Sequence, residues 1–235
     1  MASGLKIYNQ NNVLQITNEY HNMSLSDKVD VTIPASGFYD IAPGYDDIVA
    51  VNCQAPTPMW VSAYPYGNST DQPVFATRCY GPIGAHLTLY VFRLKDNPKG
   101  KYFNVYTPTG DIAFSDNAKY LKVLQQFNGE GISGLTVLGS DNMNYVNMIW
   151  AQMTDRQLWT YTHDASILCA VTIEPMVHVL SFADNWTNFR WSLQQCFEFT
   201  TTSITSTIKR VTKNINSPIT IYNNYSNLII DVTNY

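Results

Sequence analysis

The stretch L-K-I-Y-N-Q-N-N-V-L-Q-I-T, residues 5–17, decides the fold class, because the chain contains the same pattern twice more. Residues 103–115 read F-N-V-Y-T-P-T-G-D-I-A-F-S, and residues 219–231 read I-T-I-Y-N-N-Y-S-N-L-I-I-D. The three copies align without a gap, and each places a tyrosine directly after a β-branched residue. A pattern that recurs in this way indicates a repeated structural unit.

Each copy predicts a β-hairpin. In the first copy, apolar residues at a spacing of two place Leu5 and Ile7 on one face of a strand, and Leu14 and Ile16 on one face of the next. The residues between the two strands are rich in Asn, and the other copies have Pro, Gly or Ser there, all typical of turns. For the third copy this predicts a turn at residues 223–227.

A two-stranded hairpin is marginally stable alone, so each copy needs further strands beside it. After the first two copies, Met23 and Leu25 match Leu121 and Val123, which predicts a third strand in each. The third copy stops too early to have one, because the chain ends at Tyr235.

The rest of the chain also predicts strands. Short β-branched and aromatic segments are separated by Gly, Pro and Asn turns, which is typical of an antiparallel β-sandwich or barrel. These segments are 29–33, 47–53, 59–64, 74–80, 86–94, 135–138, 145–153, 157–162, 167–173, 177–182 and 189–193. The Thr-rich segment 197–211 predicts one further extended strand, because β-branched residues disfavour helices. The predicted fold class is all-β.

The hairpins also suggest a domain organisation. We expect one β-domain over residues 1–98, a second over 99–215, each opened by a hairpin, and a C-terminal hairpin tail over 216–235. Such a tail could add strands to the open sheet edge of a neighbouring subunit and build a homo-oligomer. The candidate oligomer contacts are Ile219, Ile221, Tyr222, Leu228 and Ile230.

Composition excludes some classes of function. The chain has 14 Lys and Arg residues and a formal net charge of −4, which argues against nucleic-acid binding. Its start lacks the basic and apolar regions of a signal peptide, and it has no apolar run of about 18 residues. The four cysteines are widely spaced, without a C-x-x-C metal knuckle, so we expect buried thiols.

No residue pattern predicts catalysis or a cofactor. The segment from His163 to Ser166 contains triad residue types, but a triad is defined by geometry and not by adjacency. The four histidines have no metal-binding spacing. The chain is therefore expected not to be an enzyme. A glycosidase pair would have to come from Asp40, Asp46, Asp47, Asp111, Asp164 and Glu174.

Aromatic residues are the remaining candidates for a binding surface. Strand residues of this kind can stack on sugar rings or fill a partner's pocket. The candidate contacts are Trp60, Tyr64, Tyr66, Trp159 and Tyr161. The alternative is that the tryptophans fill the core between two sheets.

The hairpins resemble a family of β-rich proteins encoded near the tail-tip and fibre genes of lambda-like tailed bacteriophages. The motif Gly4-Leu5-Lys6-Ile7-Tyr8-Asn9 is similar to the family's opening, although Asn12 stands where glycine is usual. Residues 103–106, 110–115 and 120–123 are similar to a second family segment. The family has no assigned catalytic residues.

This resemblance implies a structural protein of the virion tail, made in the cytoplasm of the bacterial host. The implied partners are other tail proteins, further copies of the chain, and possible attachment to a host-surface glycan or outer-membrane protein. A carbohydrate-binding, lectin-like module, a capsid decoration protein and a polysaccharide depolymerase are the alternatives.

Overall fold

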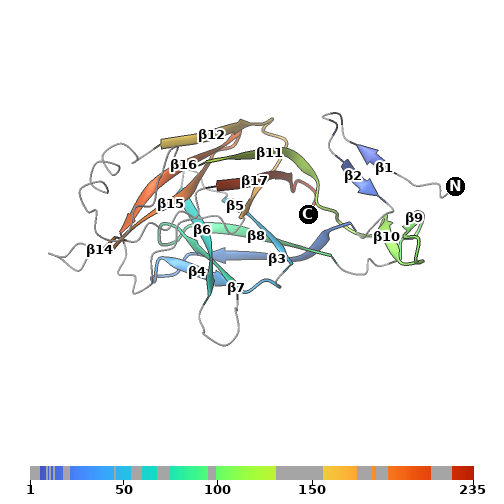
Figure 1. Cartoon of the computed structure of the whole chain (residues 1–235), viewed down its shortest axis with the longest axis horizontal. Coiled ribbons are helices and arrows are strands. Elements are labelled where there is room, and N and C mark those ends of the chain that lie inside the picture. Colours follow the sequence, from blue (N-terminus) through green and yellow to red (C-terminus); the bar gives the residue numbers. More distant parts are fainter. Residues whose placement is uncertain are drawn as a thin grey trace.

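A computed structural model describes residues 6–8, 10, 12, 14–17, 22–44, 46–53, 60–67, 75–94, 99–130, 156–173, 182–183, 190–212 and 224–235. Within these residues every regular element is a β-strand, and every pairing is antiparallel, which confirms the all-β class. Two large sheets and two separate hairpins result (Figure 1).

The described strands, in chain order, are β1 (Lys6–Tyr8), β2 (Leu14–Thr17), β3 (Ser24–Thr32), β4 (Phe38–Ile41), β5 (Ile48–Cys53), β6 (Trp60–Gly67), β7 (Phe75–Tyr80), β8 (His86–Arg93), β9 (Asn104–Tyr106), β10 (Ile112–Ser115), β11 (Val123–Glu130), β12 (Arg156–Thr162), β13 (Cys169–Ile173), β14 (Phe182–Ala183), β15 (Arg190–Phe199), β16 (Ser203–Thr212) and β17 (Asn224–Asp231).

The two large sheets share one apolar core. The first sheet has the order β11-β17-β13-β5-β8-β3, and the second has the order β12-β16-β15-β6-β7-β4 with β14 paired to β15. Alternate residues of each strand face the opposite sheet. The buried core residues are Ile33, Val49, Val51, Cys53, Cys79, Ala85, Leu87, Leu89, Trp159, Cys169, Val171, Phe197, Phe199, Ile204 and Ile229. The packing is that of a β-sandwich.

The two halves of the chain follow the same plan. From the middle of the first sheet outwards, the order is β5-β8-β3 on one side and β13-β17-β11 on the other. In the second sheet it is β6-β7-β4 on one side and β15-β16-β12 on the other. In chain order, β3 to β8 therefore correspond to β11, β12, β13, β15, β16 and β17.

Strand register supports this correspondence. A register shift falls between Leu25 and Asp27 in the β3–β8 pair, and another falls between Val123 and Gln125 in the β11–β17 pair. These are equivalent positions of the repeated sequence. Where the halves join, β5 and β13 pair through Ala50 and Thr172, which the registers also make equivalent. The halves are thus related by an approximate twofold axis at this pair.

Within each half, consecutive members of the six equivalent strands lie in opposite sheets, with one exception. The exception is the step from β6 to β7 in the first half and from β15 to β16 in the second, which stays within one sheet. This winding is typical of jelly rolls, and the described residues supply six equivalent strands in each half where eight are usual. Because β5 pairs with β13 and β6 pairs with β15, both sheets run continuously through the two halves.

The first sheet also curls until its edges meet at one end. The Leu25 N–H donates to the Lys119 carbonyl, and the Leu121 N–H donates to the Met23 carbonyl. Met23 and Leu121 are equivalent residues of the two copies. The curl encloses a second apolar cluster, and the side chain of Tyr235 enters it from the chain's end. The C-terminus accordingly lies between β3 and β11 (Figure 1).

The first two predicted hairpins are confirmed. Strands β1 and β2 form one two-stranded sheet, and β9 and β10 form the other. They lie together beyond one end of the two large sheets (Figure 1). We call these two hairpins, with residues 99–103, the hairpin lobe. The predicted third strand of each copy is also present, as β3 and β11.

The third predicted hairpin is wrong. Strand β17 runs straight through the expected turn at residues 223–227 from Asn224 onwards. The amide of Asn227 is satisfied inside the sandwich, where its Oδ1 accepts from Gln195 and its Nδ2 donates to the Thr172 carbonyl. These tertiary hydrogen bonds override the turn preference of asparagine.

Residues 224–235 of the predicted tail 216–235 are consequently part of the sandwich, and the rest of that segment lies outside the described residues. Strand β17 pairs with β11 from Asn224 to Ile230 and with β13 from Ile229 to Asp231, so it is an inner strand of the sheet and not a free strand offered to another subunit. Ile230 is fully buried and Leu228 packs against the same cluster, which contradicts their prediction as oligomer contacts. Ile219, Ile221 and Tyr222 lie outside the described residues. The two expected β-domains share both sheets and are not separate.

The single strand predicted over residues 197–211 is also wrong. The segment turns at residues 200–202 and forms the hairpin of β15 and β16. The Thr200 hydroxyl lies 2.7 Å from the Ser203 hydroxyl and accepts from the Thr202 N–H, so hydroxyl groups hold the turn. The predicted strands 135–138 and 145–153 lie outside the described residues.

Because β17 lies inside the sandwich, substitution of its buried side chains should destabilise the fold. The substitution Ile229→Ala is expected to lower the free energy of unfolding by about 2–5 kcal/mol, because Ile229 is fully buried between the sheets. Urea unfolding followed by circular dichroism measures this. The control Ile83→Ala, at a residue 69% exposed, should change it by less than about 0.5 kcal/mol. Equal effects of the two substitutions would contradict a core position for β17.

Candidate functional site

The aromatic contacts predicted from sequence divide into two groups. Trp60, Tyr64 and Tyr66 lie on β6, but their side chains are not among the described ones. Trp159 and Tyr161 alternate on β12 as predicted, and their side chains are described.

Trp159 is a core residue and not a surface contact. It is 6% exposed and stacks on Phe127 of the opposite sheet, with ring centroids 4.6 Å apart and an interplanar angle of 4°. Its neighbour Tyr161 is half-buried, and burial raises the pKa of its phenol. Tyr161 stacks on the His163 ring with centroids 6.0 Å apart. The binding role is therefore wrong for Trp159, and the alternative that the tryptophans fill the core is confirmed for this residue. Tyr161 instead packs on a histidine beside a pocket.

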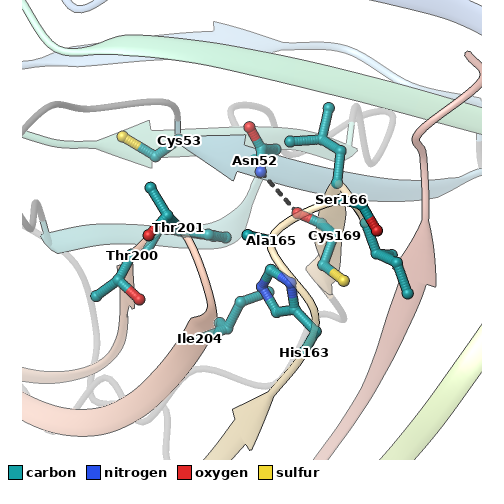
Figure 2. A pocket seen from close by; sticks show the side chains of 12 residues that line it. Asn52, Cys53, His163, Ala165, Ser166, Cys169, Thr200, Thr201 and Ile204 are labelled. Atoms are coloured by element: carbon teal, nitrogen blue, oxygen red, sulfur yellow. Dashed lines mark hydrogen bonds between the residues drawn. The ribbon is translucent and has the colours of Figure 1, made fainter.

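That pocket, drawn in Figure 2, has a volume of about 440 Å³ and lies beside the β5–β13 junction of the two halves. Three segments form it: the end of β5, the loop from β12 to β13, and the turn from β15 to β16. The lining residues are Asn52, Cys53, His163, Ala165, Ser166, Ile167, Leu168, Cys169, Phe199, Thr200, Thr201 and Ile204.

Hydrogen bonds fix the shape of the pocket. The Asn52 side-chain N–H donates to the Cys169 carbonyl at 2.6 Å, which ties β5 to β13 at the pocket wall. The Asn52 Oδ1 is buried and has no hydrogen-bond partner within the described part of the chain. In the loop, the Ser166 N–H donates to the Asp164 carboxylate and the Ile167 N–H donates to the Asp164 carbonyl, which closes a tight turn.

The tautomer of the pocket histidine follows from its contacts. The His163 Nδ1 lies 3.0 Å from the Asp164 carbonyl oxygen, which can only accept a hydrogen bond. Nδ1 must therefore carry the proton, and in the neutral ring Nε2 is an acceptor. No carboxylate hydrogen-bonds this ring in the described contacts, so the arrangement lacks the orienting group of a catalytic triad.

The cysteines are confirmed as buried free thiols. Two of them, Cys53 and Cys169, line the pocket. Burial raises the pKa of Cys53 to about 11 and, with the Asp231 carboxylate as a further cause, that of Cys169 to about 12. Both thiols are thus protonated at neutral pH and are poor nucleophiles.

In the first half, the loop between β4 and β5 corresponds to the pocket loop between β12 and β13, and an ion pair holds it. The Asp47 carboxylate, whose side chain is 2% exposed, accepts from the Arg93 guanidinium at 2.6 and 2.7 Å and from the Gly44 N–H at 2.6 Å. In the second half, Cys169 and Asp231 occupy the equivalent strand positions, and Asp231 pairs with Lys122. The two loops are therefore held by different contacts.

The described chain offers few other sites. No cluster of three His, Cys, Asp or Glu side chains in it could hold a metal ion. None of its elements is a helix of the length and apolar character needed to cross a membrane.

The hairpin lobe is the second candidate site, and the sequence analysis did not select its residues. Most of the large apolar side chains that the described structure leaves exposed belong to it. These are Ile7, Tyr8, Tyr102, Phe103 and Tyr106, whereas Ile83 and Leu94 lie elsewhere. The sequence signal for this site was the tyrosine repeated at positions 8 and 106. An exposed strand position does not require an aromatic residue for folding, so its repetition indicates a contact surface.

Comparison of the chain with protein-family models, with curated proteins and with solved structures finds no match in any of the three.

The Asp47–Arg93 ion pair predicts a defined response to acid. Hydrogen bonds from Arg93 hold the pKa of the Asp47 carboxyl below its usual value, against the opposing effect of burial. A carboxyl whose pKa is lower in the folded than in the unfolded chain stabilises the fold above the unfolded pKa of about 4, and this contribution is lost as the pH falls below it.

Asp47→Asn is accordingly expected to lower stability at pH 7 by about 0.5–1 kcal/mol, since solvent at Arg93 screens the pair. The difference from the unsubstituted chain should shrink below about pH 4. Urea unfolding at pH 7, 5 and 3 measures it, with the exposed neighbour Asp46→Asn as the control. A difference that stays constant with pH would contradict the role of the ion pair.

Proposed function

We propose that the protein is a structural component of a bacteriophage tail, located at the tail tip or fibre and without catalytic activity. The observation that carries the proposal is that the two family-like motifs coincide with the β1–β2 and β9–β10 hairpins, the elements that stand apart from the sandwich. A feature kept in both halves, yet not needed to close either large sheet, is better explained by contact with another molecule.

The surface of the hairpin lobe has the chemistry of a protein contact. Tyr102 is 82% exposed, and Tyr8 and Tyr106 are each about half exposed. The ammonium of Lys101 lies 5.0 Å from the centre of the Tyr102 ring. Aromatic side chains gathered in this way mark interaction sites, because they bury much apolar area at low entropic cost. The partner we propose is another protein of the tail.

The sandwich then serves as the scaffold that carries the lobe. Both strands that lead into it, β3 and β11, begin at the hydrogen-bonded crossing of Met23 and Leu121. This crossing links the base of one hairpin to the base of the other, and Asn22 donates to the Ala113 carbonyl of the second hairpin. The lobe is thereby attached to the sandwich by paired backbone and not by a single linker.

The experiment is antibody labelling of purified virions, observed by electron microscopy, for phage carrying substituted forms of this chain. The unsubstituted chain should be labelled at the distal end of the tail. Tyr102→Ser with Tyr106→Ser should reduce labelling, since loss of one interface aromatic costs about 2 kcal/mol, roughly 30-fold in affinity. The control Ile83→Ser removes an exposed apolar side chain outside the lobe and should label normally.

Label on the capsid, or particles without label, would contradict the tail assignment. Normal tail labelling of the double tyrosine variant would instead leave the tail location standing and contradict the role of the lobe.

A further inference from the structure

The pocket between β5, β13 and the β15–β16 turn is separate from the hairpin lobe and has no part in the proposed assembly contact. Its volume of about 440 Å³ falls in the range of small-molecule sites, about 300–1,000 Å³. It lies beside the junction of β5 with β13, which brings its wall residues together.

The lining selects the charge of a ligand. Among the described residues that line the pocket, none is Asp, Glu, Lys or Arg. A charged molecule entering it would lose water without gaining an opposite charge, which is costly. The pocket therefore fits a neutral molecule.

Polar and apolar groups are both presented to the same space. The hydroxyl-bearing residues Ser166, Thr200 and Thr201 and the imidazole of His163 stand around it, as Figure 2 shows. Apolar lining comes from Ala165, Ile167, Leu168, Phe199 and Ile204.

Hydrogen-bond acceptors are prominent among these groups. In the neutral ring the His163 Nε2 is an acceptor, because Nδ1 donates to the Asp164 carbonyl, and Tyr161 stacks on the ring. The hydroxyl oxygens of Ser166 and Thr201, which also line the pocket, can accept as well. A ligand that matches them donates several hydroxyl hydrogens and also has an apolar face.

We propose that this pocket binds a neutral sugar, in the form of a single hexose unit. A pyranose ring has the required neutral charge, its hydroxyl groups donate to the imidazole and to the side-chain hydroxyl oxygens, and its C–H face packs on the apolar side chains. The unit is either a free monosaccharide or the end of a surface polysaccharide. This binding does not depend on the assembly role proposed above.

Saturation-transfer NMR on the full chain tests the proposal with methyl glycosides of glucose, galactose, mannose and N-acetylglucosamine as probes. At least one is expected to bind with a dissociation constant of about 1 mM, the range for so small a ligand. Methyl glucuronide, which carries a carboxylate, should bind at least about tenfold more weakly.

Two substitutions and one matched control localise the binding. Ala165→Trp fills the pocket from the exposed loop and should abolish transfer. Thr201→Val removes one hydroxyl at nearly constant volume and should weaken binding about fivefold. Thr202→Val makes the same change in the next residue, which does not line the pocket, and should bind as the unsubstituted chain does. Thermal melting by circular dichroism checks that each variant is folded.

The outcomes separate cleanly. Absence of transfer to every neutral glycoside, or transfer unchanged by Ala165→Trp in a folded variant, would overturn the proposal, and so would equal binding of the glucuronide. Binding of the glycosides together with co-sedimentation on host polysaccharide identifies a chain-end ligand. Binding of the glycosides without co-sedimentation identifies a free sugar. A failure to label virion tails leaves these results unaffected.

Discussion

The antiparallel junction of β5 with β13 is the constraint on which the rest of the structure depends. It joins the first sheet of one half to that of the other through Ala50 and Thr172, both fully buried. Thr172 also accepts from the Leu228 N–H through its hydroxyl, which ties the junction to β17. Because alternate residues of these strands face opposite sides, the junction contributes at once to the core between the sheets and to the cluster inside the curled sheet.

Much of the fold can be predicted from sequence because its information is local. Alternating apolar residues identified the strands around Val49, Leu89 and Val171, and turn residues bounded them. The repeated hairpin indicated a duplication. The equivalence of the six later strands was not visible, since equivalent positions such as Phe92 and Ile230 share only apolar character. Burial requires that property and nothing more specific.

The candidate site was harder to predict, because its residues meet through long-range pairing. Asn52 and Cys169 are 117 positions apart and become neighbours only when the two halves join. The same holds for the stacking of Trp159 on Phe127, which decides between the two interpretations of Trp159, surface contact or core residue, in favour of the core. The prediction of a turn in the C-terminal strand was wrong for a related reason. Asn227 reads as a turn residue, but the side chains around it supply the hydrogen bonds that a turn would. Two surfaces result, an aromatic lobe suited to a protein partner and a neutral pocket suited to a small molecule, on one duplicated scaffold.

Hydrogen exchange of the full chain, followed by mass spectrometry in increasing denaturant, tests the central claim that both halves form one folded unit. The account predicts that the amides of β5, β13 and β17 are all strongly protected and lose protection together, at the denaturant concentration of global unfolding. Exchange of residues 224–231 well before the rest, or loss of protection in one half at a lower denaturant concentration, would contradict it.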